Sequence, residues 1–443
     1  MMIEEEIVII GGGIAGLATA LALKRVGFQS RVLERNPELR AGGTALTLLT
    51  NAWFALRALG VDHKLKSVYQ PINKSLVTNL DTGAVQELGF SGTKENREDA
   101  GVITVHRKAL LETLAEELPP DTIRFSSKLI SIKSETLKDS TKATLLHLED
   151  GTVIKSKVVI GCDGVHSAVA QWLGLSQPLS SGRWAARGLA VFPEGHGLNH
   201  GVKQYLSAGT RAGFVTINSK EIYWFVVTYS SLEKDISTNP ELLLEEVEKN
   251  LAKDLPSEFL TIVKETDLST LSWVPLLFRA PWNIAFCKAQ NGCVTIAGDA
   301  MHPMTPDLAQ GGCSALEDAI ILARCISQAH PMATNDKQWL EKALKRYVEE
   351  RRWRVTWLVA GAWLAGWVQQ GGGGDQQWWS GMARWFRDRI ESDLELDWAI
   401  DIPEIIGTEH GPYGQFQSQT GEEPFITVNH QGYPKFIFFN EKD

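Results

Sequence analysis

A glycine-rich segment near the start of the chain has the spacing GxGxxG of a diphosphate-binding turn. Its residues are Gly11, Gly12, Gly13, Ile14, Ala15 and Gly16. It follows an apolar run at 7–10 and precedes a stretch at 15–26 that predicts a helix, which is the context the motif requires. Gly11 permits a tight turn, Gly13 lets the backbone approach a diphosphate, and Gly16 allows close packing of the helix on the strand. We therefore expect this segment to bind the diphosphate of a dinucleotide at the N-terminus of the helix.

Glu34 stands where the second strand of a βαβ unit would end. Gly27 ends the predicted helix, and residues 30–33 form a second strand candidate directly before Glu34. A carboxylate at this place can accept hydrogen bonds from both hydroxyl groups of an adenosine ribose, whereas it would repel a 2′-phosphate. Arg35, the next residue, is included among the expected cofactor contacts. At this point FAD and NAD are both open as the dinucleotide.

Two distant segments repeat the combination of a short apolar run followed by glycine and aspartate. The first, Gly-Cys-Asp-Gly-Val-His-Ser at 161–167, follows a predicted strand at 158–160. The second, Gly-Asp-Ala-Met-His-Pro at 298–303, follows a predicted strand at 294–297. Open parallel sheets bind ligands at the carboxyl ends of their strands. We therefore expect the three motifs to meet at one edge of a sheet.

Together the three motifs resemble the fingerprints of the class A flavoprotein monooxygenases, the group related to para-hydroxybenzoate hydroxylase, salicylate hydroxylase and zeaxanthin epoxidase. The resemblance covers roughly residues 5–350, and the segments 161–174 and 298–324 are similar to the plant monooxygenase-1 type. It implies FAD as the cofactor and NAD(P)H as a transient co-substrate. It also implies an activity in which a C4a-hydroperoxyflavin, formed with O2, hydroxylates or epoxidises a small hydrophobic metabolite that is aromatic or polycyclic.

The resemblance also implies which side chains contact the cofactor. Asp299 would hold the ribityl chain, and Asp163 with Gly164 would lie where the flavin meets the incoming nicotinamide. Arg107 matches a family arginine that faces the flavin, and Arg40 matches one near the diphosphate. For Arg40, a solvated surface charge is the alternative interpretation.

A helix start near residue 314 is expected to face the pyrimidine edge of the flavin, and Gly43 is expected beside the isoalloxazine. Ser314-Ala315-Leu316-Glu317 fits a capping box, which predicts that the helix begins there. The residues before it that would contact the flavin are Pro306, Ala309, Gly311 and Gly312. Oriented N–H groups and a helix dipole at this place would stabilise negative charge near N1 and O2 of the ring.

Two positions depart from the family pattern. Ala309 stands where the family usually has glycine, so either its φ is negative or the loop has shifted. Ala170 ends the Asp-Gly segment, where many relatives have arginine. These departures would suit an alternative function, a flavin oxidase or dehydrogenase of the same fold. A second alternative is a non-catalytic, FAD-stabilised interaction protein. No catalytic residue is predicted, because His302 suits a structural hydrogen bond better than the role of a base.

The fold class expected is α/β, with a Rossmann-like FAD-binding domain of the glutathione-reductase type interleaved with an antiparallel-sheet substrate domain. Period-two stretches at 212–217 and 221–228 predict that second sheet. The predicted divisions are 1–70, 100–178 and 284–345 for FAD, 71–99 and 179–283 for substrate, and 346–443 for a C-terminal helical segment and tail. Aromatic walls against the substrate, or ordinary core, are the two interpretations of Phe214, Tyr223, Trp224 and Phe225.

Composition narrows the class of protein. Hydrophobic residues make up 44% and charged residues 22%, as in a folded enzyme. Acidic residues outnumber basic ones by 53 to 44 without a basic run, so nucleic acid is not an expected partner. The five cysteines form no CxxC pair, which predicts neither a metal site nor a disulfide framework. With no leader segment evident, the expected location is cytoplasmic.

Tryptophan spacing near the C-terminus predicts two amphipathic helices. The first is marked by Trp353, Trp357, Leu364 and Trp367, and the second by Trp378, Met382, Trp385 and Phe386. Packing over the substrate domain is one interpretation, and peripheral contact with a membrane is the other. The chain is expected to be a monomer or a weak dimer.

Overall fold

The computed structural model describes residues 2–39, 44–89, 101–136, 142–229, 231–330 and 338–371, together with the backbone of two short strands, β18 (Thr427–Val428) and β19 (Pro434–Lys435). Two expected cofactor contacts, Arg40 and Gly43, lie outside the described residues. The second amphipathic helix, predicted near Trp378, lies outside them as well.

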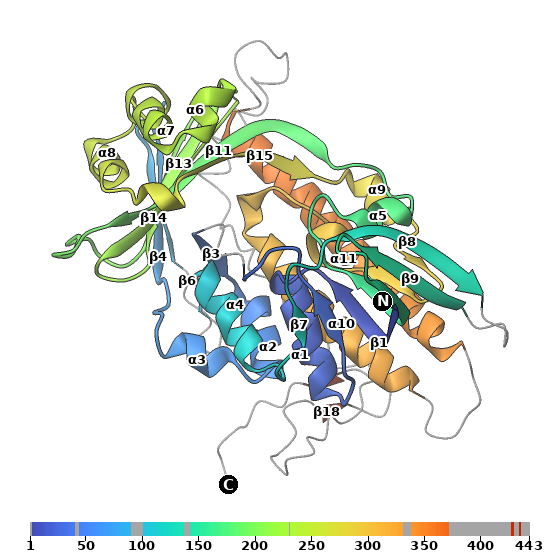
Figure 1. Cartoon of the computed structure of the whole chain (residues 1–443). Coiled ribbons are helices and arrows are strands. Elements are labelled where there is room, and N and C mark those ends of the chain that lie inside the picture. Colours follow the sequence, from blue (N-terminus) through green and yellow to red (C-terminus); the bar gives the residue numbers. More distant parts are fainter. Residues whose placement is uncertain are drawn as a thin grey trace, which may run out of the picture.

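A sheet of eight strands is built around β1, whose neighbours on both sides run parallel to it (Figure 1). Its strands are β1 (Met2–Ile10), β2 (Arg31–Leu33), β7 (Ile123–Arg124), β8 (Leu129–Thr136), β9 (Lys142–Leu148), β10 (Val153–Gly161), β16 (Gln290–Asn291) and β17 (Val294–Ile296). The spatial order β17-β10-β1-β2-β7 is parallel throughout, while β9 joins β10 as an antiparallel hairpin. The carboxyl ends of β1, β2, β10 and β17 therefore lie at one edge.

Helices cover this sheet, so residues 7–10 of its central strand and most of its first helix are buried. Every residue of α1 (Ile14–Arg25) from Ile14 to Leu23 is buried, as expected of a helix that is apolar all round. Helix α1 packs against α10 (Gln310–Ala329), and α10 also packs against α2. The remaining elements of this part are β3 (Ala45–Leu48), β6 (Ile103–His106), α2 (Thr50–Ala58), α3 (Asp62–Lys66), α4 (Arg107–Glu116) and α5 (Ala168–Trp172).

The second sheet has seven strands in the order β15-β11-β14-β13-β12-β4-β5. They are β4 (Lys74–Asn79), β5 (Val85–Gly89), β11 (Leu179–Val191), β12 (Val202–Ser207), β13 (Thr210–Thr216), β14 (Glu221–Thr228) and β15 (Ser272–Phe278). All pairs are antiparallel except β4 with β12. The antiparallel sheet predicted from the period-two stretches is thus confirmed, and two strands from residues 74–89 extend it.

The two faces of this sheet have different neighbours, which resolves the roles of its aromatic residues. Helices cover one face (Figure 1), and they are α6 (Lys234–Thr238), α7 (Pro240–Glu246), the π-helical turn η1 (Val247–Leu251) and α8 (Ser257–Lys264), with η2 (Leu268–Thr270) following. Phe214 and Trp224 are buried there around Phe259, so they are ordinary core. Tyr223 and Phe225 alternate with them and point to the opposite face, where Tyr223 packs against the core of the first sheet.

A single long helix, α11 (Trp339–Gln369), follows α10 and packs against it and against α9 (Pro281–Ala285) (Figure 1). Trp353, Trp357 and Leu364 are exposed on α11, so the interpretation that they pack over the substrate sheet is wrong for these three, whereas Trp367 is half-buried. Trp363 does stack on Phe278 of that sheet. Within the described part of the chain, no helix combines the length and apolar character needed to traverse a bilayer.

Candidate functional site

Three glycines of the GxGxxG motif differ in what surrounds them, two of them in the turn between β1 and α1 and one, Gly16, in α1. Gly11 has a φ of +105°, and a Cβ there would press on the carbonyl group of Cys162. A Cβ on Gly16 would overlap the carbonyl oxygen of Gly11. Gly13 has an ordinary φ of −85°, and a Cβ there would meet nothing within 4 Å. The protein itself requires glycine at two positions, while at Gly13 the missing side chain leaves space for a ligand.

Glu34 lies at the end of β2 and closes over this turn. Its Oε2 accepts a hydrogen bond from the Gly12 N–H at 2.7 Å, and its Oε1 accepts the backbone and side-chain N–H groups of Asn36 at 2.8 and 2.7 Å. A carboxylate offers about four acceptor positions, so about one, on Oε2, is left for a ribose hydroxyl. The sequence did not reveal the bond to Gly12. Arg35 is exposed beside it.

The structure brings the three motifs together. A Cβ added to Gly11 would lie 3.0 Å from the Cα of Asp163, one added to Gly298 would lie 2.8 Å from the Cβ of Ala15, and one added to Gly312 would lie 3.6 Å from Ile14. Because these segments follow β10 and β17 or open α10, their approach to the first turn is a consequence of the parallel strand order. The convergence expected at the carboxyl edge is present.

Asp299 lies on the 3-10 turn η3 (Gly298–Ala300), directly after β17. Its side chain is exposed, yet the surrounding protein raises the pKa of its carboxyl, an effect that the charges of His302 and Arg107 partly oppose. A carboxyl that is both open to solvent and crowded by protein lies in a recess of the surface. The charge of Arg107, the first residue of α4, also acts on this carboxyl, so the two predicted contacts lie within electrostatic range of each other.

Asp163 and Gly164 form the turn between β10 and α5. Gly164 has a φ of +83°. The Asp163 carboxylate accepts hydrogen bonds from the Ser167 hydroxyl and from the N–H groups of Ala168 and Val169, so it caps α5. Desolvation raises the pKa of this carboxyl, and these hydrogen bonds counteract the rise. The carboxylate of Asp163 therefore bonds within its own turn. It is the backbone of this turn that lies next to the glycine motif.

The start of α10 corrects two expectations. The helix begins at Gln310, four residues before Ser314, so the capping-box interpretation is wrong. Ala309 precedes the helix with a φ of +53°, so of the two alternatives, a negative φ or a shifted loop, the first is wrong. Alanine here adopts the left-handed conformation that favours glycine. Gly311 and Gly312 lie in the first turn of the helix, and the exposed Pro306 begins the 3-10 turn η4 (Pro306–Leu308) before it.

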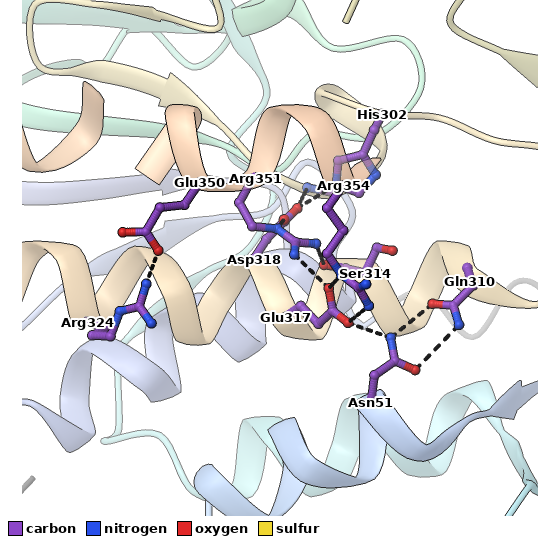
Figure 2. Close-up of polar contacts among 11 residues, drawn as sticks. Asn51, His302, Gln310, Ser314, Glu317, Asp318, Arg324, Glu350, Arg351 and Arg354 are labelled. Carbon is purple, nitrogen blue, oxygen red and sulfur yellow. Dashed lines mark hydrogen bonds and ion pairs between the residues drawn. The ribbon is translucent and has the colours of Figure 1, made fainter. Parts of the chain in front are cut away.

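A buried network that the sequence did not predict connects α10, η3 and α11 (Figure 2). Asp318 Oδ2 accepts the Gly298 N–H at 2.7 Å and lies 2.6 Å from His302 Nε2, while Oδ1 accepts Arg351 Nε at 2.6 Å. Burial alone would raise the pKa of Asp318, but His302 and Arg351 lower it to about 2. The ionised carboxylate thereby fixes the backbone of the turn that carries Asp299. The structural role expected for His302 agrees with this geometry.

Glu317 extends the network toward α2 (Figure 2). It forms ion pairs with Arg351 at 2.6 Å and with Arg354 at 2.5 Å, and it accepts Asn51 Nδ2 at 2.6 Å. Asn51 also donates to Gln310, the first residue of α10, at 2.9 Å. Glu317 is therefore bound to α11 and does not cap its own helix. The three-residue spacing of Arg351 and Arg354 indicates one helix face, but the sequence gives no indication of the carboxylates that they meet.

Cys313 lies in the first turns of α10 and is fully buried. Its Sγ donates to the Ala309 carbonyl at 3.3 Å, and burial raises the pKa of the thiol to about 12. The thiol is protonated at neutral pH and serves as a small packing residue.

The residues present fit a flavin dinucleotide. Gly13 is open beside a helix N-terminus, Glu34 retains acceptor capacity at the end of β2, and Asp299 is exposed within electrostatic range of Arg107. Fold and site together define a dinucleotide-binding oxidoreductase with a second sheet beside the cofactor. The family model of the FAD binding domain matches residues 4–362, and the chain belongs to this family.

Known relatives agree with this assignment. The chain is 41% identical over 398 residues to Monooxygenase 2 of Arabidopsis thaliana, covering 87% of this chain and 93% of the relative. It is 36% identical to Monooxygenase 1 of the same plant, over 82% of this chain and 91% of the relative. The crystal structure of Klebsiella pneumoniae HpxO complexed with FAD and uric acid has the same fold, with a TM-score of 0.74, 21% identity, and coverage of 91% of this chain and 96% of that one. The protein is an FAD-dependent oxidoreductase of the monooxygenase type.

Proposed function

We propose that the enzyme uses NAD(P)H and O2 to hydroxylate or epoxidise a small hydrophobic metabolite that is aromatic or polycyclic. The relatives named as monooxygenases support this reaction class. The observation that carries the proposal is the convergence of the three motifs beside Asp299, next to a sheet face that bears Tyr223 and Phe225. FAD, when bound, supplies the electron transfer and the activation of dioxygen.

The protein contributes binding, orientation and exclusion of water. In this proposal Gly13 and the N-terminus of α1 bind the diphosphate, Glu34 binds the adenosine ribose, and Asp299 binds the ribityl chain. The N-terminus of α10 supplies N–H groups to the pyrimidine edge of the flavin. The second sheet, with strands from the predicted substrate divisions 71–99 and 179–283, encloses the substrate.

The alternative function, an oxidase or dehydrogenase, was suggested by two departures from the family pattern, and the structure removes the first of them. The alternative rested partly on Ala309, but Ala309 keeps the left-handed conformation expected of the family glycine. The second departure, Ala170, is buried in α5 and its N–H donates to the Ser167 hydroxyl, so it has a packing role. The observations therefore favour oxygen transfer.

A substrate screen with labelled dioxygen tests the proposal. Candidate aromatic and polycyclic metabolites are added to the FAD-loaded enzyme, and NADH and NADPH oxidation is followed. We expect at least one compound to stimulate oxidation and to carry one labelled oxygen atom in its product. Unlabelled oxidised product and hydrogen peroxide, formed without consumption of NAD(P)H, would support the oxidase alternative. A Gly13→Val variant serves as the control, because its side chain would occupy the expected diphosphate position.

Three other expectations stay predictions. The exposed Trp353 and Trp357 are compatible with peripheral membrane contact, and co-sedimentation with vesicles would test it. The monomeric or weakly dimeric state and the cytoplasmic location also stay predictions, and each needs a measurement of its own.

A further inference from the structure

Asp307 lies in the turn η4, and its carboxylate is fully buried between two arginines of the second sheet. Oδ1 accepts Arg183 Nη1 at 3.0 Å and Arg211 Nη1 at 2.9 Å, while Oδ2 accepts Arg183 Nη2 at 2.7 Å. Arg183 belongs to β11 and Arg211 to β13. The contact therefore joins the second sheet to the turn that directly precedes α10.

The end of α11 encloses the same cluster. Gln370 accepts a hydrogen bond from Arg183 Nη1 at 2.9 Å and donates to the carbonyl groups of Gly209 and Val227 at 3.2 and 3.0 Å. A Cβ on Gly366 would overlap the guanidinium of Arg183, so glycine is needed there. Burial would raise the pKa of Asp307, but the two arginines hold it below its ordinary value. Asp307 is therefore ionised and rigidly held.

Ala309, two residues after Asp307, has a backbone conformation that alanine adopts at a cost and glycine does not. Its N–H donates to the Pro306 carbonyl at 3.0 Å, which closes η4, and it directly precedes the first residue of α10. Strained backbone persists where the surrounding structure determines it. The ionised Asp307, two residues before Ala309, supplies such a constraint.

We propose that Arg183 and Arg211 are positioning residues, which hold Asp307 and through it keep Ala309 in the left-handed conformation that directs the N-terminus of α10 toward FAD. The second sheet thereby sets the geometry of the cofactor site. The inference rests on the proposed position of FAD, and it concerns cofactor affinity rather than the reaction.

A double-mutant cycle tests this proposal. The proteins are the wild type, Asp307→Asn, Ala309→Gly and the double variant, and the readouts are the FAD dissociation constant and the thermal unfolding of the apoprotein. Asp307→Asn keeps the size of the side chain but removes its charge. We expect it to weaken FAD binding about tenfold, a change of about 1.4 kcal/mol. With Ala309→Gly also present, the loss should be at most about threefold, since glycine adopts the turn without the constraint.

A matched control is Glu258→Gln, which removes the 2.9 Å ion pair between Glu258 of α8 and Lys203 of β12, on the helix-covered face of the same sheet. FAD affinity should be unchanged by this substitution, with or without Ala309→Gly. Equal losses from Asp307→Asn in both backgrounds, or no loss in either, would overturn the proposal. If Asp307→Asn does not fold, Arg211→Gln takes its place in the cycle, because Arg183 then still pairs with Asp307. An enzyme that binds FAD but oxidises no substrate contradicts the proposed function and leaves this test intact.

Discussion

Gly13 and Gly16 are close in sequence but should respond differently to the addition of one methyl group. At Gly13 a Cβ would enter open space, whereas at Gly16 it would overlap the Gly11 carbonyl oxygen. We expect Gly13→Ala to leave the unfolding of the apoprotein unchanged and to weaken FAD binding about tenfold or more. Gly16→Ala should lower the unfolding temperature itself. Calorimetry of the apoproteins and titration with FAD measure both effects, and wild-type FAD affinity in Gly13→Ala would mean that the diphosphate lies elsewhere.

Asp299 and Asp163 both follow strands of the first sheet, but we expect the Asp299 carboxylate to bind FAD, whereas the Asp163 carboxylate caps α5. Asp299→Ala should reduce FAD affinity with little change in apoprotein stability, because the side chain is exposed in its recess. Asp163→Ala should destabilise the apoprotein by about 1–2 kcal/mol, the usual cost of losing a helix cap. Denaturant unfolding and FAD titration of both variants separate these effects. The reverse assignment, with FAD affinity lost in Asp163→Ala alone, would contradict the geometry.

The contact between α10 and α11 depends on buried charges. Arg351 pairs with both Glu317 and Asp318, so Arg351→Met would leave two buried carboxylates short of a partner. Breaking a buried pair in this way costs about 3–5 kcal/mol. On the exposed side of α11, Lys345 pairs with Glu349 at 3.8 Å, and Lys345→Met should cost less than about 0.5 kcal/mol. Comparing the two variants by denaturant unfolding controls for the loss of a positive charge.

The same carboxylates should make the fold sensitive to acid. The pKa of Glu317 in the folded protein is about 2, against an ordinary value of 4.5, although burial alone would raise it, because Arg351 and Arg354 favour the ionised form. The unfolded chain therefore binds the proton first as the pH falls. The contribution of Glu317 to stability is complete above about pH 4.5 and is lost as the pH falls toward 2.

A pH series of unfolding experiments checks this prediction. Between about pH 4.5 and 2, the range set by the unfolded and folded pKa values of Glu317, the unfolding free energy of the wild type should fall more steeply than that of Glu317→Gln. Parallel slopes for the two proteins would show that Glu317 is not ionised at low pH in the folded state.

Elements set by local sequence were predictable, and elements set by distant partners were not. The apolar run before Gly11 and the glycine spacing fix the first βαβ unit within a few residues, so β1, α1 and β2 are confirmed. The capping box at Ser314 is a local signal, and contacts with a distant helix override it. Glu317 pairs with Arg351 of α11, and the helix begins earlier, at Gln310. The positive φ of Ala309 was not predicted from the residue itself, because alanine rarely adopts this conformation.

At the scale of the whole molecule, the order of strands explains why remote motifs form one site. β1, β10 and β17 are adjacent and parallel, so the turns after them meet although nearly 300 residues separate the first from the last. The sequence indicated this edge through its glycine and aspartate residues. It did not indicate the long-range ion pairs of Arg183, Arg211 and Arg351, because a charge pair leaves no spacing signal between distant segments.

FAD should therefore stabilise the fold as a unit, because its expected contacts come from all of these turns. A ligand that binds only the folded state stabilises it by about 2.7 kcal/mol at a hundredfold excess over its dissociation constant. We expect the unfolding temperature to rise with FAD concentration, and hydrogen exchange to slow together at residues 11–16, 163–164 and 298–312. Gly13→Ala should need more FAD for the same rise. If exchange slowed at the first turn alone, the three turns would not share one ligand, and the proposed groove would be wrong.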